Sequence, residues 1–218
     1  WAPRKPGVEV NQASVFIPKT GSRAPLTQQD MIDHASAAIV RIEVGEATAS
    51  GFIIDPDGLI LTSNYVTRDS EVVSVSLRDG STHTGQVVGR DLLRNLALIR
   101  IEASGLSWLE LADVGQVETG SEVFALGYTT SPDEIKLVSG VVADLKIDAG
   151  RNIRRLQINV PLGWEYSGGP VLNVYGEVAG VVDAKTVSGG IQGAGLAIAA
   201  NTVNVYLERL KAGEIISN

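Results

Sequence analysis

Several residue types are absent or scarce in this chain, and each absence removes a class of function. The 218 residues include no cysteine, which excludes disulfide scaffolds, thiolate metal sites and cysteine nucleophiles. Only two histidines, His34 and His83, are available for imidazole chemistry. No apolar run reaches the roughly 18 residues that a membrane-spanning helix needs. We therefore expect no cofactor and no metal site.

Basic residues are fewer than acidic residues in this chain. Lys and Arg number 18 against 25 Asp and Glu, so the net charge is −7, and no basic run occurs anywhere. Proteins that bind nucleic acid or anionic membrane surfaces present clustered basic side chains to the phosphates. Nucleic acid is accordingly excluded as an expected partner. Apolar residues, by contrast, make up 44% of the chain, which is ample for the core of one large or two small domains.

The two ends of the chain differ from its middle. Residues 1–25 are polar and contain four prolines, which predicts a tail or linker. A short helix is predicted over 26–38, because Thr27 can cap it and Asp30 follows three residues later. A second helix is predicted over 201–213, where apolar residues recur on one face and a glycine ends the pattern.

Between these helices the apolar residues follow a period of two. The segments "AIVRIEV" and "VVSVSLR" alternate apolar and polar positions, as half-buried strands do. Three turns, Pro56-Asp57-Gly58, Asp79-Gly80 and Tyr175-Gly176, predict hairpins and hence antiparallel pairing. Strands that recur every 8 to 15 residues or so are typical of a β-sandwich or a β-barrel. The fold class predicted from the pattern is all-β.

The stretch "EYSGGP", residues 165–170, places a serine on a glycine-rich turn between two predicted strands. Alone, such a short motif marks a simple turn more often than a nucleophile. Here it follows "SGFIIDPDGLILTS" and "DLLRNLALIRI" in chain order, and "GSEVFALGY" and "GLAIAANTV" flank it. Together these blocks resemble the trypsin-like serine proteases, and specifically their HtrA (Deg) branch, from about residue 26 to 213.

The resemblance implies two six-stranded antiparallel β-barrels with an active site in the cleft between them. Residues 26–110 would form the N-terminal helix and first barrel, and residues 111–218 the second barrel and C-terminal helix of one trypsin-like domain. By the resemblance, Ser167 stands at the nucleophile position, Tyr65 in place of the catalytic histidine and Asn95 in place of the catalytic aspartate. Neither His34 nor His83 falls in a segment that lines the family's cleft.

These departures bear directly on catalysis. A serine hydroxyl attacks a carbonyl only when a neighbour accepts its proton, and a phenol with a pKa of about 10 accepts protons poorly near pH 7. In the family, Gly-Asn or Gly-Asp precedes the nucleophile and helps to form the oxyanion hole, whereas Glu165 and Tyr166 stand here. A carboxylate near that site would oppose the developing negative charge.

The catalytic aspartate that the resemblance places at position 95 is absent, but an acidic residue, Asp183, is expected nearby. By the resemblance, Asp183 replaces a small residue that faces the position of the catalytic aspartate. It could accept a hydrogen bond from the Asn95 amide or the Tyr65 phenol, or it could be a solvated loop acid. The sequence leaves both alternatives open because a register shift of one residue would reverse the side chain's direction.

Two functions remain open from the sequence. The first is a catalytically inactive HtrA-like pseudoprotease that binds a protein or peptide, or serves as an assembly or sensory module, outside the cytoplasm. The alternative is a weakly active or atypical serine endopeptidase that uses Ser167. The resemblance adds three weaker expectations: homo-oligomerisation as a trimer through apolar residues near Phe16, a membrane anchor outside this chain, and a PDZ domain outside it.

Overall fold

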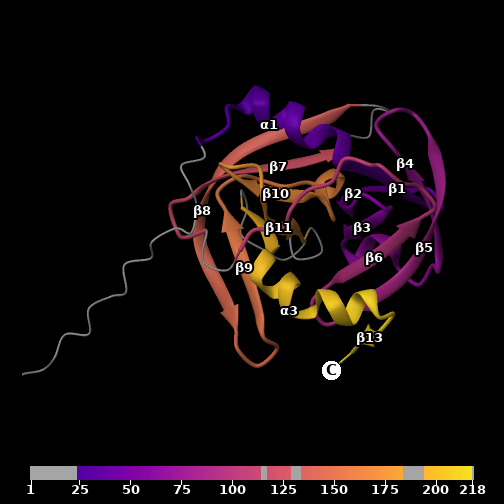
Figure 1. Cartoon of the computed structure of the whole chain (residues 1–218). Helices are drawn as coiled ribbons and strands as arrows, with labels where there is room; N and C mark the ends of the chain where they lie inside the picture. The colour runs from indigo at the N-terminus through magenta and orange to yellow at the C-terminus, as the bar shows by residue number, and fades with distance from the viewer. Residues whose placement is uncertain (1–23, 114–116, 129–133, 184–193, 218) are drawn as a thin grey trace, which may run out of the picture.

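The computed structural model describes residues 24–113, 117–128, 134–183 and 194–217 (Figure 1). The predicted tail, 1–25, lies outside the described residues except for its last two, and Phe16 lies outside them as well. Within the described part, no helix combines the length and apolar character needed to cross a membrane.

The first half of the chain forms a closed antiparallel barrel. Its strands neighbour one another in the order β5-β4-β1-β2-β3-β6, and pairing of β5 with β6 closes the ring. In chain order its six strands are β1 (Ile39–Val44), β2 (Ala47–Asp55), β3 (Leu59–Thr62), β4 (Val72–Ser76), β5 (Thr82–Asp91) and β6 (Leu96–Ile101).

The second half forms another closed antiparallel barrel, with strand order β10-β11-β12-β9-β8-β7. In chain order its six strands are β7 (Glu122–Tyr128), β8 (Ile135–Asp148), β9 (Ile153–Ile158), β10 (Pro170–Asn173), β11 (Val178–Val182) and β12 (Gly195–Ala199). The predicted pair of six-stranded barrels is therefore confirmed. Figure 1 shows them side by side, the first in purple and magenta and the second mainly in orange.

The hairpin turns have the chemistry that the sequence indicated. Between β2 and β3, the Asp57 N–H donates to Asp55 Oδ1 at 2.9 Å, which folds the turn on itself. Gly58 then adopts a φ of +85°, and a Cβ at this position would lie 2.4 Å from the Ile101 carbonyl oxygen. Only glycine satisfies both constraints.

Short helices complete the two barrels. The predicted N-terminal helix is α1 (Gln28–Ala35), followed by the 3₁₀ turn η1 (Ser36–Ala38), and Thr27 and Asp30 form the capping box that the sequence predicted. The predicted C-terminal helix is α3 (Ala200–Lys211). Two further short elements, α2 (Asn64–Thr67) and η2 (Trp164–Tyr166), lie in the connections that carry the candidate site.

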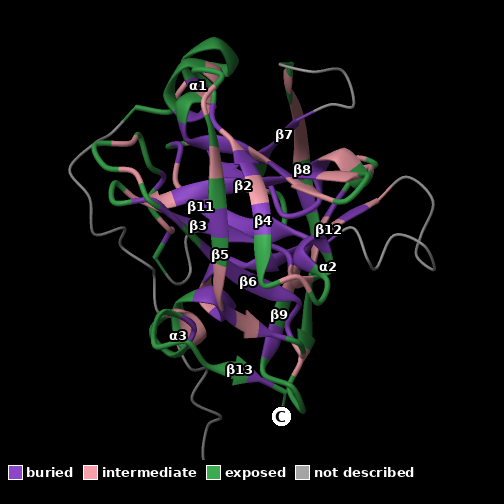
Figure 2. Cartoon of the chain, turned by 90° about the vertical axis from the view of Figure 1, so that its right-hand side faces the viewer, coloured by how far each residue is buried: buried purple, intermediate pink, exposed green. Residues whose placement is uncertain are grey.

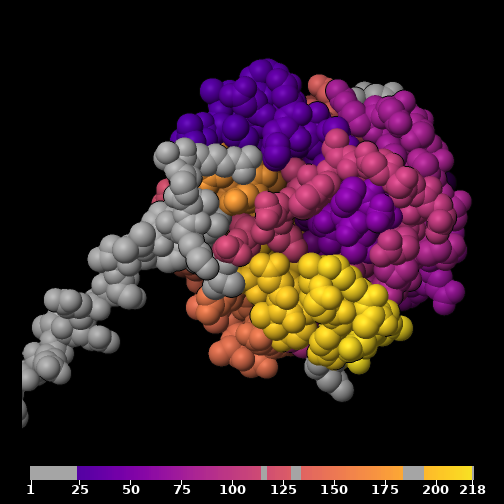
Figure 3. Space-filling model, viewed as in Figure 1, coloured from indigo at the N-terminus to yellow at the C-terminus, as the bar shows by residue number. Residues whose placement is uncertain are grey.

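The C-terminal segment returns to the first barrel. After α3, the short strand β13 (Ile215–Ile216) pairs in parallel with β5, where the Leu92 N–H donates to the Ile216 carbonyl at 2.9 Å. A Cβ at Gly89 would lie 2.2 Å from the Leu210 carbonyl oxygen, so glycine permits α3 to approach β5 closely. Figure 3 shows α3, in yellow, lying along both barrels on this face.

Apolar residues of the two barrels share one large core cluster. It extends from Phe52 and Leu98 of the first barrel to Phe124, Leu172 and Ile198 of the second, all at most 2% exposed. Figure 2 shows this buried interior in purple beneath exposed helices and turns. Each large apolar side chain buried in this way contributes about 1.5–3 kcal/mol, so the shared cluster fixes the relative position of the barrels.

Candidate functional site

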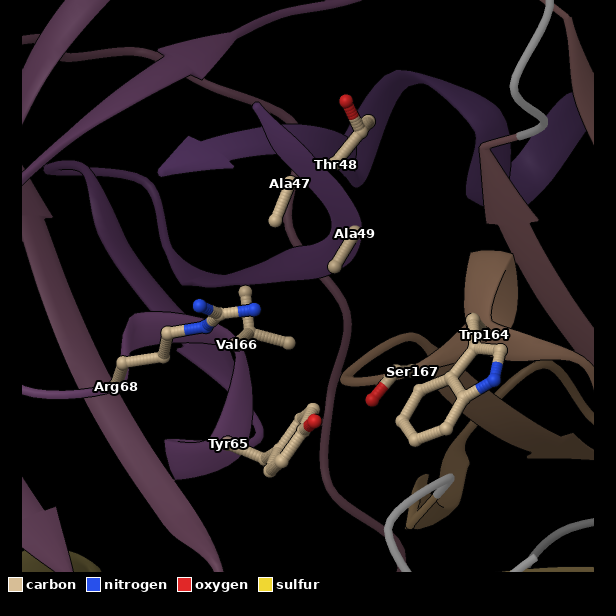
Figure 4. Close-up of a pocket in the computed structure, with 8 residues that line it drawn as sticks. All are labelled: Ala47, Thr48, Ala49, Tyr65, Val66, Arg68, Trp164 and Ser167. Atoms are coloured by element: carbon tan, nitrogen blue, oxygen red, sulfur yellow. The ribbon is translucent and has the colours of Figure 1, made fainter. Parts of the chain in front are cut away.

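Two of the predicted site residues line one cavity of about 230 Å³, Tyr65 from α2 and Ser167 from the turn after η2. Figure 4 shows the Ser167 hydroxyl between the Tyr65 ring and the Trp164 ring. The cavity is lined by Ala47, Thr48, Ala49, Tyr65, Val66, Arg68, Trp164 and Ser167. It thus lies where segments from the two barrels meet.

Asn95 does not line this cavity, but it is bonded to the backbone of the helix that carries Tyr65. Its Oδ1 accepts the Tyr65 N–H at 2.8 Å, and its carbonyl accepts the Asn64 N–H at 3.1 Å. Asn95 has a φ of +57°, a left-handed conformation that asparagine tolerates better than most residues. The turn between β5 and β6 therefore fixes the start of α2.

The other side of the Asn95 amide meets Asp183 at the end of β11. Asn95 Nδ2 donates to Asp183 Oδ1 at 2.8 Å, so the predicted hydrogen bond between these two residues is present and the solvated alternative is wrong. Asp183 is only 3% exposed, and its Oδ2 lies 3.6 Å from Arg155 Nε. Both ends of the Asn95 amide and the Asp183 carboxylate are therefore engaged.

A buried ion pair supports the same turn from below. Arg94 Nη1 donates to Asp91 Oδ2 at 3.0 Å, and Asp91 Oδ1 accepts the Arg94 N–H at 2.9 Å. The guanidinium also lies 3.6 Å from the centre of the Tyr206 ring and donates to the Arg151 carbonyl. Since Asp91 is fully buried, these contacts hold the turn before Asn95 in one geometry.

Ser167 differs from Asn95 in having an unengaged side chain. The residue is 2% exposed, and its Oγ is buried without a hydrogen-bond partner among the described residues. The backbone N–H of Ser167 donates to the Trp164 carbonyl at 2.9 Å, within the η2 turn. That N–H is consequently not free to stabilise an oxyanion. At Gly168, with a φ of +77°, a Cβ would lie 2.5 Å from the Ser50 carbonyl oxygen, so the turn after the serine requires glycine.

Of the three residues predicted to form the oxyanion loop, Ser167 lines the cavity, whereas Glu165 and Tyr166 are not among its described lining residues. The Glu165 carbonyl accepts a hydrogen bond from Ser50 Oγ at 2.6 Å, and its carboxylate lies against Gly163. Tyr166 packs into the core of the second barrel. Burial, and secondarily the Glu165 carboxylate, raises the pKa of the Tyr166 phenol, so this side chain stays neutral at physiological pH.

Three contributors to the site were missed in the sequence. Trp164 packs against Tyr65 with ring centroids 5.5 Å apart and the ring planes tilted by 32°, and it remains half exposed. Its signal was an aromatic residue three positions before the serine of a glycine-rich turn. Arg155 could not have been identified, because its partner Asp183 comes from another segment of the chain. Arg94 had a local signal, since Asp91 lies three residues before it.

Neither histidine belongs to the site, as the sequence indicated. His34 is exposed on α1, and His83 is on β5, where its Nε2 lies 3.1 Å from Ser81 Oγ. No cluster of metal-ligating side chains occurs in the described part of the chain. Within that part, neither imidazole nor carboxylate contacts the Ser167 hydroxyl, and a phenol near neutral pH cannot replace them as a base.

Comparison with known proteins agrees with the fold and the motifs. Residues 49–181 match the trypsin-like peptidase domain. The chain is 32% identical over 171 residues to the serine protease HhoB of Synechocystis sp., which covers 76% of this chain and 40% of that protein. It is also 32% identical over 171 residues to a DegP-like periplasmic serine endoprotease of Marinomonas sp., covering 77% of this chain and 36% of the relative.

A solved structure gives the same result for the fold. A variant of the HtrA-type protease AlgW with a tripeptide superposes with a TM-score of 0.74 at 23% identity, covering 84% of this chain and 63% of that one. The chain spans about two fifths of the length of the curated relatives it matches.

Proposed function

We propose, since the chain belongs to the trypsin-like peptidase family and to its HtrA branch, that it is a catalytically inactive member that binds a protein or peptide in the cleft beside Ser167. The observation that carries the proposal is the isolation of the Ser167 hydroxyl, which is buried and makes no hydrogen bond to any described residue. Without a base in contact, a serine hydroxyl is a weak nucleophile.

Three further observations support inactivity. Tyr65 stands where the resemblance places the catalytic histidine, and its ring is packed against Trp164. The Asn95 amide, at the position of the acid, donates to Asp183 and cannot stabilise a positive charge on a base. The Ser167 N–H is occupied by the Trp164 carbonyl. Loss of a catalytic group in such sites reduces turnover by roughly 10⁴- to 10⁶-fold.

The names of the relatives support the proposed binding role and location. Relatives such as the Marinomonas protein are named periplasmic serine endoproteases, so we assign this chain a protein or peptide partner and an extracytoplasmic location. Association of copies as trimers remains a proposal that analytical ultracentrifugation of the full chain would decide.

Labelling with a fluorophosphonate probe and casein hydrolysis test the inactivity. The unmodified chain should give background values in both. Tyr65→His with Asn95→Asp should remain near background, because the new carboxylate would face Asp183 and the oxyanion site would still be absent. Adding Asp183→Ser, Glu165→Gly and Tyr166→Asn should raise labelling by at least about tenfold, since triad and oxyanion hole act on one transition state.

The control is the variant with the same five substitutions and Ser167→Ala in addition, which should not be labelled. Casein cleavage by the unmodified chain that disappears in Ser167→Ala would overturn the proposal and favour the weakly active endopeptidase. Full activity in the double variant alone would overturn the argument about Glu165 and Tyr166.

A further inference from the structure

The cavity beside Ser167 combines an apolar wall with a cation, Arg68, that pairs with no carboxylate of the described residues. Its apolar part comes from Ala47, Ala49, Val66 and the two aromatic rings. Figure 4 shows the Arg68 guanidinium extended over Val66 toward the cavity. Among the described residues, no aspartate or glutamate lines this cavity. A ligand that fills it would meet apolar surface and one positive charge.

The positive charge is reinforced from beneath. Arg90 donates to Asn64 Oδ1 at 3.0 Å, to Thr67 Oγ1 at 2.6 Å and to the carbonyls of Arg68 and Ser70, all of them neutral acceptors. In the described part of the chain neither Arg68 nor Arg90 forms an ion pair with a carboxylate. Arg68 lines the cavity, and Arg90 adds a second positive charge through its contact with the Arg68 carbonyl.

A second cavity on the molecule has the opposite character. It has a volume of about 210 Å³ and is lined by Asp113 and Glu118 as well as by Arg154. The negative charges of Asp113 and Glu118 offset the positive charge of Arg154. Of these two cavities, the one beside Ser167 has the lining that favours an anion.

The size of the cavity limits the ligand to a single residue. At about 230 Å³ it is smaller than the roughly 300–1,000 Å³ of pockets that enclose a drug-sized molecule. Because the apolar wall and Arg68 belong to the same small space, the carboxylate must be carried by the same residue as the apolar side chain. An aspartate or glutamate supplies the anion without the apolar group. The C-terminal residue of a peptide supplies both.

We infer that this cavity binds the C-terminal residue of a peptide or protein, with an aliphatic side chain against the Tyr65–Trp164 pair and the α-carboxylate on Arg68. The inference rests on the proposed function, because it names the chemistry of the partner at the same cleft. It also gives the inactive serine turn a structural use, since η2 presents Trp164 as one wall of the site.

Fluorescence anisotropy with two labelled peptides tests the inference. The peptide Gly-Ser-Gly-Ala-Leu carries a fluorophore at its N-terminus and ends in a free carboxylate in one form and in an amide in the other. The free acid should bind the full chain about tenfold more tightly, which corresponds to about 1.4 kcal/mol at 25 °C. Arg68→Gln should reduce binding of the acid about tenfold and remove the difference between the two peptides.

Two variants separate charge from apolar contact. Arg100→Gln removes another exposed cation of the first barrel, one that is not among the cavity's described lining residues, and it should change neither affinity. Trp164→Ala should weaken both peptides by the same factor, because it removes a wall that does not depend on the carboxylate. Circular dichroism of each variant would establish that the fold is intact.

The outcomes distinguish this inference from the proposed function. Equal binding of acid and amide to the unmodified chain would overturn the inference while peptide binding stands. Equal effects of Arg68→Gln and Arg100→Gln would also overturn it. Failure of both peptides to bind would overturn the inference and the binding role together. If casein hydrolysis disproves inactivity, the comparison of acid and amide on Ser167→Ala still decides the inference.

Discussion

The acid side of the cleft, around Asn95, and the nucleophile side, around Ser167, differ in the hydrogen bonding of their buried polar side chains. On the acid side, Asp91, Arg94, Asn95 and Asp183 are buried and joined by hydrogen bonds of 2.8–3.0 Å. On the nucleophile side, Ser167 Oγ is equally buried but has no partner in the described residues. The carboxylates and the amide that support the scaffold are hydrogen-bonded, whereas the hydroxyl at the nucleophile position is isolated. This difference is what the proposed inactive, binding role predicts.

The largest change in the free energy of unfolding is expected on the acid side. Asp91→Ala should lower the free energy of unfolding by about 3–5 kcal/mol, because it leaves the Arg94 guanidinium buried without its carboxylate. Asp148→Ala is the matched control, since Asp148 pairs with Arg151 at the same spacing but on the surface, and it should cost about 0–1 kcal/mol. Urea unfolding measures both. Similar losses in the two variants would remove the distinction between buried and exposed pairs.

An intermediate effect is expected at the Asn95–Asp183 contact. Asn95→Asp would set two carboxylates face to face and should cost about 1–3 kcal/mol at pH 7, even with Arg155 nearby. Like charges raise the folded-state pKa of the pair above the unfolded value of about 3.9. The penalty is therefore present at neutral pH and falls as the pH is lowered through the raised pKa.

The exchange Asn95→Asp with Asp183→Asn controls for this electrostatic origin. It restores one amide and one carboxylate, and it should recover most of the stability at pH 7. Urea midpoints at pH 4.5 and pH 7 measure the effect. A loss for the single variant that is the same at both pH values would contradict the charge argument.

The smallest effect is expected at Ser167 itself. Ser167→Ala should leave stability unchanged or raise it by up to about 1 kcal/mol, because it removes a buried hydroxyl that has no partner. Ser50→Ala is the matched control. The Ser50 hydroxyl donates to the Glu165 carbonyl at 2.6 Å and accepts the Tyr128 N–H at 2.9 Å, so its loss should cost about 1–3 kcal/mol. Thermal unfolding of both variants would show the contrast, and a greater loss for Ser167→Ala would reverse it.

The fold was more accessible to sequence reasoning than the site. Alternation in β1 and β4 and the turns at Gly58, Gly80 and Gly176 report local backbone requirements, so hairpins and helices could be predicted from neighbouring residues. The resemblance supplied the closure into two barrels. Pairing of β13 with β5 joins residues more than a hundred positions apart, and no local pattern marks it.

Within the site, the sequence located positions but not contacts. The hydrogen bond between Asn95 and Asp183 was one of two open alternatives, because the direction of Asp183 depends on the end of β11. The part played by Arg155 depends on the register of β9, and the capture of the Ser167 N–H depends on the η2 turn. The catalytic roles assigned to Tyr65, Asn95, Ser167, Glu165 and Tyr166 remain predictions for the experiments above to decide.

The parallel pairing of β13 with β5 also bears on the order of events during synthesis. Ribosomes extend a chain at about 5–20 residues per second, so the first barrel is complete in sequence several seconds before residues 215–216 emerge. Until then the edge of β5 near Arg90 and Leu92 lacks its last ladder partners, which the Glu214 and Ile216 carbonyls later provide. Such distant contacts raise the contact order and slow the final folding step. During that interval the growing chain exposes an open strand edge, which is a site for non-native strand pairing.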